Sequence, residues 1–288
     1  MSKLTHVKRI LSVVAFLLVF VLVYRQVSWV LQEKVDKCDR LHSFFQQPAN
    51  SLDVVFVGSS HIHYSVYPNQ LWHDYGFTSY DASSPAQAIP VSYYLIKETV
   101  EKKHPQIIVL DTYYMVYDVY ARNQEHIHEL TDSMGLFSGN RFAAINDLVP
   151  NTEGDETVWS YYFNIALYHS RWSELTSLDF APIRGFLKGA LIFGSNEKVE
   201  IYEPVEEKLA VPDTAMEYLN RIRQVCEEND TELLLISIPY QRFPEVFMAL
   251  EEMDWDLIAM KEDEESKAEL ARRIAKWQEM SPDMPLKK

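Results

Sequence analysis

The stretch VVFVGSSHIHYSVYP, from Val54 to Pro68, runs an apolar segment directly into Gly-Ser-Ser-His. Consecutive apolar residues that end at Gly58 predict a buried strand over 53–58. In an open parallel sheet, ligands bind beyond the carboxyl ends of the strands, and Ser60 follows this end directly. Its hydroxyl can therefore project into such a crevice, where its backbone N–H is available to a developing oxyanion. The same position also suits a turn or helix-cap residue, and both interpretations stay open.

Further strands and helices alternate along the chain. Thr214 and Glu217 form a capping box at the start of one helix, and Asn229-Asp230 turns the chain after it. The region of about 115–211 has no strong period and is predicted to be an insertion over the sheet. Apolar strands that alternate with helices are typical of a parallel sheet covered on both faces. The predicted strands cover 77–82, 106–112 and 232–239, and the helices cover 89–103 and 214–228.

The N-terminus carries a candidate membrane anchor. A basic segment over 3–9 precedes the uncharged run Ile10–Tyr24. This run covers about 22 Å as a helix, so Val27–Leu31 must complete the ~30 Å hydrocarbon core while Arg25 snorkels along the helix. A cleaved signal peptide is the alternative, but no small-residue cleavage site follows the run.

The charge distribution predicts which parts of the chain lie on each side of the membrane. Residues 1–31 are expected to be a cytoplasmic N-terminus and single-pass anchor, because cations precede the span. Tyr24 and Trp29 are suited to the membrane interface. Residues 32–50 are predicted to be a juxtamembrane linker, and everything beyond them is expected outside the cell.

Charge and cysteine content limit the possible partners. The net charge of −15, from 27 basic and 42 acidic residues, would repel a phosphate backbone, so nucleic acid is not expected as a partner. Cys38 and Cys226 are the two cysteines of the chain. They either form one long-range bridge, or Cys226 is a buried residue on a helix face.

Three blocks of the sequence carry a family resemblance: VVFVGSSHIHYSVYP, YDASSPAQAIPVSYYLIKE and KKHPQIIVLDTYY. In this order and spacing the chain resembles the SGNH/GDSL hydrolase superfamily. It is similar in particular to membrane-anchored bacterial members related to the D-alanine-transfer protein of teichoic acid modification and to alginate acetylation proteins. The resemblance implies a three-layer, flavodoxin-like parallel sheet over 51–250. It also implies that Ser60 is the nucleophile, with Ser59 in place of the family's aspartate.

The same resemblance suggests an oxyanion hole. The second block normally supplies a glycine N–H, and here the equivalent backbone belongs to Ala82, Ser83 and Ser84. The third block normally carries Gly-x-Asn-Asp, whose asparagine donates a second hydrogen bond. This chain has Tyr113 and Tyr114 there, so a tyrosine hydroxyl is the candidate replacement.

The general base is not assigned by these motifs. The superfamily places Asp-x-x-His near the C-terminus, whereas the last histidine of this chain is His169. The C-terminal block is therefore lost or altered, or the chain is a shortened version of a longer one. His63, at i+3 from Ser60, and His169, in the insertion, are the candidate bases, with a cap or hydrogen-bonding role as the alternative for His63. His61 is expected to point away from the Ser60 hydroxyl.

Two further segments have candidate roles outside this site. The H-x-H spacing within 125–129 could grip a metal from a strand, but an ordinary solvent-facing loop is the alternative, and no metal or cofactor is expected. Residues 251–288 are predicted to form a charged amphipathic helix that packs on a domain or a partner, with Leu270, Ile274 and Trp277 as its apolar stripe.

The sequence thus predicts a membrane-anchored, extracytoplasmic esterase or acyltransferase. Its substrate would be an acylated polysaccharide or a teichoic-acid-like polymer of the cell envelope. The alternative is a catalytically inactive module of the same fold that binds a polymer or a membrane-bound acyltransferase. The missing Asp-x-x-His favours this alternative.

The N-terminal pattern gives a first testable prediction. Because the anchor is expected to stay uncleaved, the protein should remain with membranes after carbonate washing. Protease added from outside should digest residues beyond Gln32. Release of a soluble form shortened by about 30 residues, the length of a signal peptide, would contradict the anchor.

Overall fold

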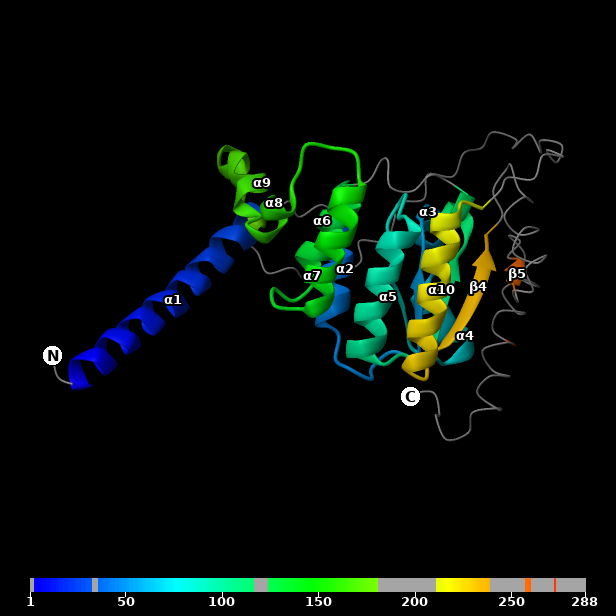
Figure 1. Ribbon diagram of the computed structural model, residues 1–288. Helices are drawn as coiled ribbons and strands as arrows, with labels where there is room; N and C mark the ends of the chain where they lie inside the picture. The colour runs from blue at the N-terminus through cyan, green and yellow to red at the C-terminus, as the bar shows by residue number, and fades with distance from the viewer. Residues whose placement is uncertain are drawn as a thin grey trace.

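The computed structural model describes residues 3–32, 36–116, 124–180, 211–238, 257–259 and 272. Within them, five parallel strands form one sheet in the order β2-β1-β3-β4-β5 (Figure 1). This is the strand order of flavodoxin-like doubly wound sheets. The prediction of an α/β fold with a parallel sheet is confirmed. The strands are β1 (Val54–Val57), β2 (Ser79–Asp81), β3 (Ile107–Asp111), β4 (Glu232–Ser237) and β5 (Leu257–Ala259).

Helices cover both faces of the sheet, which explains why its central strands are apolar throughout. On one face, Val55 and Leu110 belong to the core beneath α5 and α10. On the other face, Phe56 packs with Ile62 of α3. Right-handed crossovers that run in opposite directions along a sheet lie on opposite faces, as the connections β1 to β2 and β2 to β3 do here. The covering helices are α3 (Ser60–Ser65), α4 (Pro68–Tyr75), α5 (Ile89–Lys103) and α10 (Asp213–Glu228).

Most predicted elements of this α/β unit are confirmed, and one predicted cap is wrong. The helix predicted over 89–103 is α5 with the same bounds. The expected capping box at Thr214 does not form, because α10 begins one residue earlier, at Asp213. Pro212, with φ −59° and ψ 143°, sets the extended entry into this helix, and no side chain caps it. The predicted strands contain β1, β2, β3 and β4.

The segment predicted as a linker, 32–50, contains a packed helix. Helix α2 (Asp36–Gln46) buries Leu41 and Phe44, which are 1% and 0% exposed. The ring of Phe44 lies 5.1 Å from the ring of Tyr80 in β2. The linker prediction is therefore wrong for this part of the segment. In the sequence, the few apolar residues of α2 lie among charged residues, yet they share one face of an amphipathic helix.

Helices also make up the described part of the predicted insertion. The helices α6 and α7 pack mainly against α2 and α5 (Figure 1). Because α5 already covers that face of the sheet, this part of the insertion lies beyond α5. The prediction that the insertion lies over the sheet is therefore wrong for this part. Its helices are α6 (Gln124–Ser133), α7 (Gly139–Leu148), α8 (Val158–Tyr162) and α9 (Ile165–Tyr168), with the 3₁₀ segments η1 (Tyr113–Val116), η2 (Val149–Asn151), η3 (His169–Ser173) and η4 (Ser177–Phe180).

The N-terminal helix α1 (Lys3–Leu31) is one unbroken element. Its segment His6–Leu31 contains an 18-residue window with a mean hydropathy of 2.3 and is long and apolar enough to cross a membrane. The apolar side chains from Ile10 to Val23 are almost all exposed to the surroundings. Figure 1 shows this helix projecting away from the rest of the molecule.

Hydrogen bonds fix the C-terminal end of α1 to the helical region. The hydroxyl of Ser28 donates to Oδ1 of Asn164 at 2.6 Å. The guanidinium of Arg171 donates to the carbonyl of Leu31 at 2.7 Å. These bonds explain why α8 and α9 lie beside this end of α1 in Figure 1.

The C-terminal region is described only in part. Residues 257–259, inside the segment predicted as a charged helix over 251–288, form the strand β5. That prediction is therefore wrong for these residues, whose apolar side chains instead extend the sheet beside β4. The stripe of Leu270, Ile274 and Trp277 lies outside the described residues. Cys226 is a buried free thiol on α10, as the helix-face alternative predicts.

Candidate functional site

The carboxyl ends of β1 and β3 mark the switch point of this sheet. From β1 the chain crosses to β2 on one side, whereas the later connections run to the other side. A crevice forms outside the strands at such a point, and ligands bind there in this class of fold. Val57 is paired with Leu110, so the residues that follow them, Gly58 and Asp111, face one another. Ser59 and Ser60 come directly after this point.

Gly58 is required by a close contact between these two strand ends. A Cβ atom at position 58 would lie 2.6 Å from Cβ of Asp111 and 2.9 Å from Cγ1 of Ile62. Any larger residue would push α3 or β3 away from β1. The glycine therefore lets the first turn of α3 sit directly against the end of β3.

Ser59 and Ser60 have different roles in the turn. Ser59 is the N-cap of α3 and is 1% exposed. Its hydroxyl accepts from the N–H of His61 at 3.4 Å and donates to Oδ2 of Asp111 at 3.1 Å. Ser60 is the first residue of α3 and is half-buried. Within the described part of the chain its hydroxyl makes no hydrogen bond, so the cap role belongs to Ser59 and leaves the Ser60 hydroxyl open.

Asp111 is a buried carboxyl with perturbed ionisation. Burial raises its pKa to about 6, although the backbone N–H of Tyr113 and the hydroxyl of Ser59 donate to it and oppose this shift. Nδ1 of His61 lies 3.9 Å from Oδ2 of Asp111. Burial also lowers the pKa of His61 to about 4, so its imidazole is neutral at pH 7.

His61 is the functional candidate that the sequence did not single out. The sequence predicted only that the His61 ring points away from the Ser60 hydroxyl, and it suggested no partner for the ring. In the structure its ring contacts the ring of Tyr113, with centroids 3.8 Å apart, next to Asp111. Tyr114 in turn packs edge-on against Tyr113 at 5.4 Å. The H-x-H spacing after Ser60 was the available signal, because α3 turns one of its two histidines toward β3.

The expected oxyanion donors of the second block are already committed. The N–H of Ala82 donates to the carbonyl of Phe56 at 2.9 Å. The N–H of Ser83 donates to Oδ1 of Asp81 at 3.0 Å, and the N–H of Ser84 donates to the carbonyl of Gly58 at 3.2 Å. The prediction that these three amides hold an oxyanion is therefore wrong for this conformation. The sheet pairing of β2 and an aspartate turn after it use these donors first.

His63 lies on another side of α3. Its Nε2 is 3.3 Å from Nη2 of Arg40 in α2, and this guanidinium pairs with the carboxylate of Asp81. The side chain is thus part of a contact between α3, α2 and the end of β2. This arrangement matches the hydrogen-bonding alternative for His63 better than the role of base for Ser60.

His169 lies far from the strand ends. It belongs to η3, directly after α9, and its Nδ1 is 2.8 Å from the carbonyl of Ala166. Figure 1 places α9 beside the end of α1, at the opposite end of the molecule from α3. The prediction that His169 folds over the site is therefore wrong.

The H-x-H segment over 125–129 lies in α6, where His126 and Glu129 are part of a buried polar cluster, so the alternative of a solvent-facing loop is wrong. His126 lies 3.2 Å from Oε2 of Glu129, and the hydroxyl of Ser84 donates to the same oxygen at 2.5 Å. His128 faces elsewhere and stacks on Tyr161 at 4.1 Å. In a helix, residues two apart do not share a face, so the two histidines take different partners. Among the described residues no group of three or more His, Cys, Asp or Glu side chains could hold a metal ion.

Comparisons with family models, with curated proteins and with solved structures found no match to this chain. The resemblance to the SGNH/GDSL superfamily therefore rests on the three sequence blocks and stays a proposal.

The different roles of the two serines predict different effects on stability. Ser59→Ala should lower the free energy of unfolding by about 1–2 kcal/mol, because it removes a helix cap and a hydrogen bond to a buried carboxyl. Ser60→Ala should change it by less than about 0.5 kcal/mol. Denaturant unfolding of both variants, followed by circular dichroism, measures the difference. The reverse order would show that Ser60 is the structural residue.

Because the pKa of Asp111 is raised on folding, the stability of the protein should depend on pH, and Asp111→Asn should remove this dependence. Its pKa rises from 3.8 to about 6 on folding, so the folded protein holds a proton that the unfolded chain has lost between these pH values. Relative to Asp111→Asn, the wild type should therefore lose up to about 3 kcal/mol of stability as the pH rises through this window. Burial lowers the pKa of His61 in both proteins, so its opposite effect cancels in the comparison. A difference that is constant with pH would contradict the prediction.

Proposed function

We propose that this protein is a membrane-anchored, extracytoplasmic serine esterase or acyltransferase that acts on acyl esters of a cell-envelope glycopolymer. The observation that carries the proposal is the open, half-buried hydroxyl of Ser60 at the switch point of a parallel sheet. The neighbouring Ser59 already serves as the cap, so Ser60 has no structural task of that kind. The similarity of the three sequence blocks to SGNH/GDSL hydrolases supports the same residue as nucleophile.

In this proposal Oγ of Ser60 attacks the carbonyl carbon of the acyl ester. A base takes the hydroxyl proton and returns it to the departing sugar or polyol oxygen, which leaves an acyl-serine. Water, or a hydroxyl of a second polymer, then accepts the acyl group and restores Ser60. The N–H of Ser60 is one of the first amides of α3, which have no acceptor within the helix, so it is the candidate donor to the oxyanion.

His61 is the base assigned in this proposal, because its ring lies beside the Asp111 carboxyl at the end of β3. Its imidazole is neutral at pH 7 and can therefore accept a proton, although its low pKa of about 4 makes it a weak base. Asp111 lies 3.9 Å from Nδ1 and can orient the ring after a small movement. His63, in contrast, already faces the guanidinium of Arg40.

A specific observation favours the inactive module as a second candidate. The amides of Ala82, Ser83 and Ser84 all donate elsewhere, so none of these three supplies a second oxyanion donor. Losing one such donor costs on the order of 10²–10³ in rate. A protein that only binds a polymer, or a membrane-bound acyltransferase, needs no such donor.

A fluorophosphonate probe separates the two candidates. The open hydroxyl of Ser60 should displace fluoride and form a covalent phosphonyl-serine in the folded wild-type protein. Ser60→Ala should abolish labelling, and His61→Gln should slow it roughly 10²-fold or more, as loss of a general base does.

Ser65→Ala is the matched control, because Ser65 is an exposed serine at the other end of α3. It should leave labelling unchanged. Folded wild-type protein that is not labelled would exclude the nucleophile and support the inactive module.

A further inference from the structure

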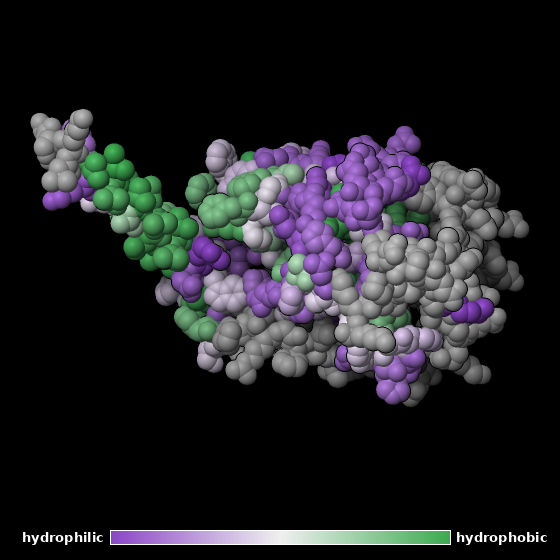
Figure 2. Space-filling model, turned by 90° about the horizontal axis from the view of Figure 1, so that it is seen from below, coloured by the Kyte–Doolittle hydropathy of each residue, from purple (hydrophilic) through white to green (hydrophobic). Residues whose placement is uncertain are grey.

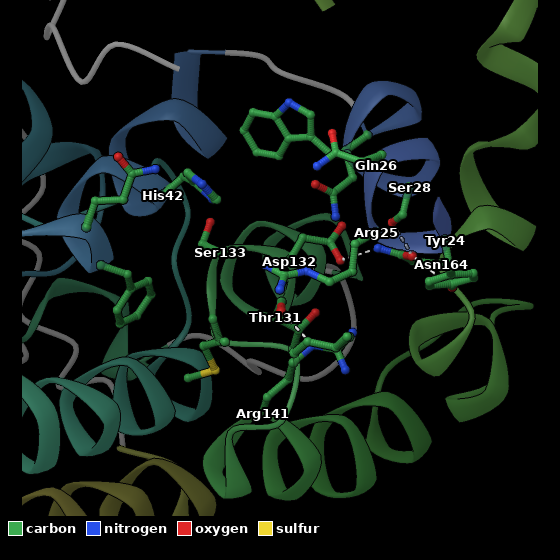
Figure 3. Close-up of a pocket in the computed structure, with 17 residues that line it drawn as sticks. Tyr24, Arg25, Gln26, Ser28, His42, Thr131, Asp132, Ser133, Arg141 and Asn164 are labelled. Atoms are coloured by element: carbon green, nitrogen blue, oxygen red, sulfur yellow. Dashed lines mark hydrogen bonds between the residues drawn. The ribbon is translucent and has the colours of Figure 1, made fainter. Parts of the chain in front are cut away.

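A polar cavity of about 580 Å³ lies where α1 meets the rest of the molecule (Figure 3). Side chains from the end of α1, from α2 and from the turn between α6 and α7 converge on it. It contains none of the residues proposed for catalysis. Its polar and charged lining includes Arg25, Gln26, Gln32, His42, Asp132 and Arg141.

An apolar groove of about 330 Å³ adjoins this cavity. The two share Tyr24, Leu136 and Arg141 in their walls, so they meet at the same level of α1. One wall of the groove is the apolar part of α1, and the other is formed by aromatic side chains of α7 and α8. Figure 2 shows apolar atoms of α1 beside a smaller apolar patch on the adjoining end of the body. The apolar lining includes Phe20, Val21, Phe142, Trp159 and Phe163.

The order of these linings along α1 matches the profile of a lipid leaflet. The apolar groove lies at Phe20 and Val21, and the polar cavity extends from Tyr24 to Gln32. The segment His6–Leu31 has 26 residues, which as a helix spans about 39 Å and exceeds the ~30 Å hydrocarbon core. The end of α1 therefore reaches the headgroup region while Phe20 and Val21 remain at the depth of the acyl chains.

Exposed aromatic side chains border the groove and suit the same environment. Trp159 is 67% exposed and Phe163 is 57% exposed, and their rings lie 6.4 Å apart. Phe137, also in the lining, is 75% exposed. A cluster of exposed aromatic side chains is unfavourable in water, whereas aromatic residues are enriched at the membrane interface.

The charges of the cavity favour an anion. Arg141 is buried, with its Nε and Nη2 held by the carbonyls of Thr131 and Tyr161 at 2.8 Å. Asp132 accepts a hydrogen bond from the Tyr168 hydroxyl at 2.6 Å.

Arg25 is exposed at the cavity and makes no ion pair within the described residues. The charges of Arg25, Arg141 and Asp132 sum to one positive charge, and arginine is well suited to binding a phosphate group.

We propose that the cavity and the groove form one binding site for an anionic phospholipid. The phosphodiester of the lipid contacts the Arg25 guanidinium within the positive field of Arg141, and one acyl chain lies in the groove between α1 and the aromatic residues. The inference rests on the membrane anchoring in the proposed function but not on catalysis by Ser60. It gives the protein a lipid ligand on the outer leaflet, apart from its polymer substrate.

Native mass spectrometry of the full chain in an uncharged detergent tests this site. Dioleoyl phosphatidylglycerol should be retained as one tightly bound molecule. Dioleoylglycerol, which lacks the phosphate, and inorganic phosphate, which lacks the chains, should each bind far more weakly. Arg25→Gln should weaken phosphatidylglycerol binding roughly tenfold or more, as expected for loss of a charged hydrogen bond. Trp159→Ala should weaken it as well.

Matched controls are available elsewhere in the fold. Arg223→Gln and Trp72→Ala change exposed residues of α10 and α4 and should leave binding unchanged. Equal binding of phosphatidylglycerol and dioleoylglycerol, binding of phosphate alone at the same strength, or an unchanged affinity in Arg25→Gln would overturn the proposal.

The same preparation distinguishes this inference from the proposed catalysis. Ser60→Ala should bind phosphatidylglycerol as the wild type does. Loss of lipid binding with intact fluorophosphonate labelling would overturn the lipid site alone, and the opposite result would overturn catalysis alone. If the isolated protein lacks α1 because that helix has been cleaved off, both the membrane anchoring and the lipid site would be contradicted.

Discussion

The close approach of Gly58 and Asp111 is the constraint on which the candidate site depends. Because no Cβ separates the two strand ends, the first turn of α3 can pack against the end of β3. This contact brings the Ser59 hydroxyl to the Asp111 carboxylate and turns His61 toward the same carboxylate. The buried carboxyl, the neutral imidazole and the open serine are thus consequences of one glycine at the end of β1.

Local patterns in the sequence were sufficient for the α/β unit. The strands are runs of apolar residues because both of their faces are buried, and α5 has clear boundaries between Ala88 and His104. Helix α2 was missed because its charged residues outnumber the few apolar ones that reach the core. The capping box of α10 failed because Pro212 already fixes the chain before Thr214. Such errors concern helix ends and short amphipathic helices, where a few residues decide the outcome.

The site itself could be predicted only in part. Ser60 follows from the strand and the glycine before it, but the division of roles between Ser59 and Ser60 depends on Asp111, which is 52 residues away from Ser59 in the chain. The amides of residues 82–84 likewise donate to acceptors that only the folded sheet brings close to them. His169 and His63 were candidates by type and spacing, and only the fold shows that other groups hold them.

The hydrogen bonds that join Asn164 and Arg171 to the end of α1 limit where Ser60 can lie relative to this helix. A catalytic head on a flexible tether could sample many heights above a bilayer. Here α1 is hydrogen-bonded to the segment between α8 and α9 and to η3, so the position of the rest of the protein relative to this helix is fixed. If α1 spans a membrane, Ser60 is held at a fixed distance from the bilayer, and in the proposed function only ester groups at that distance would reach it.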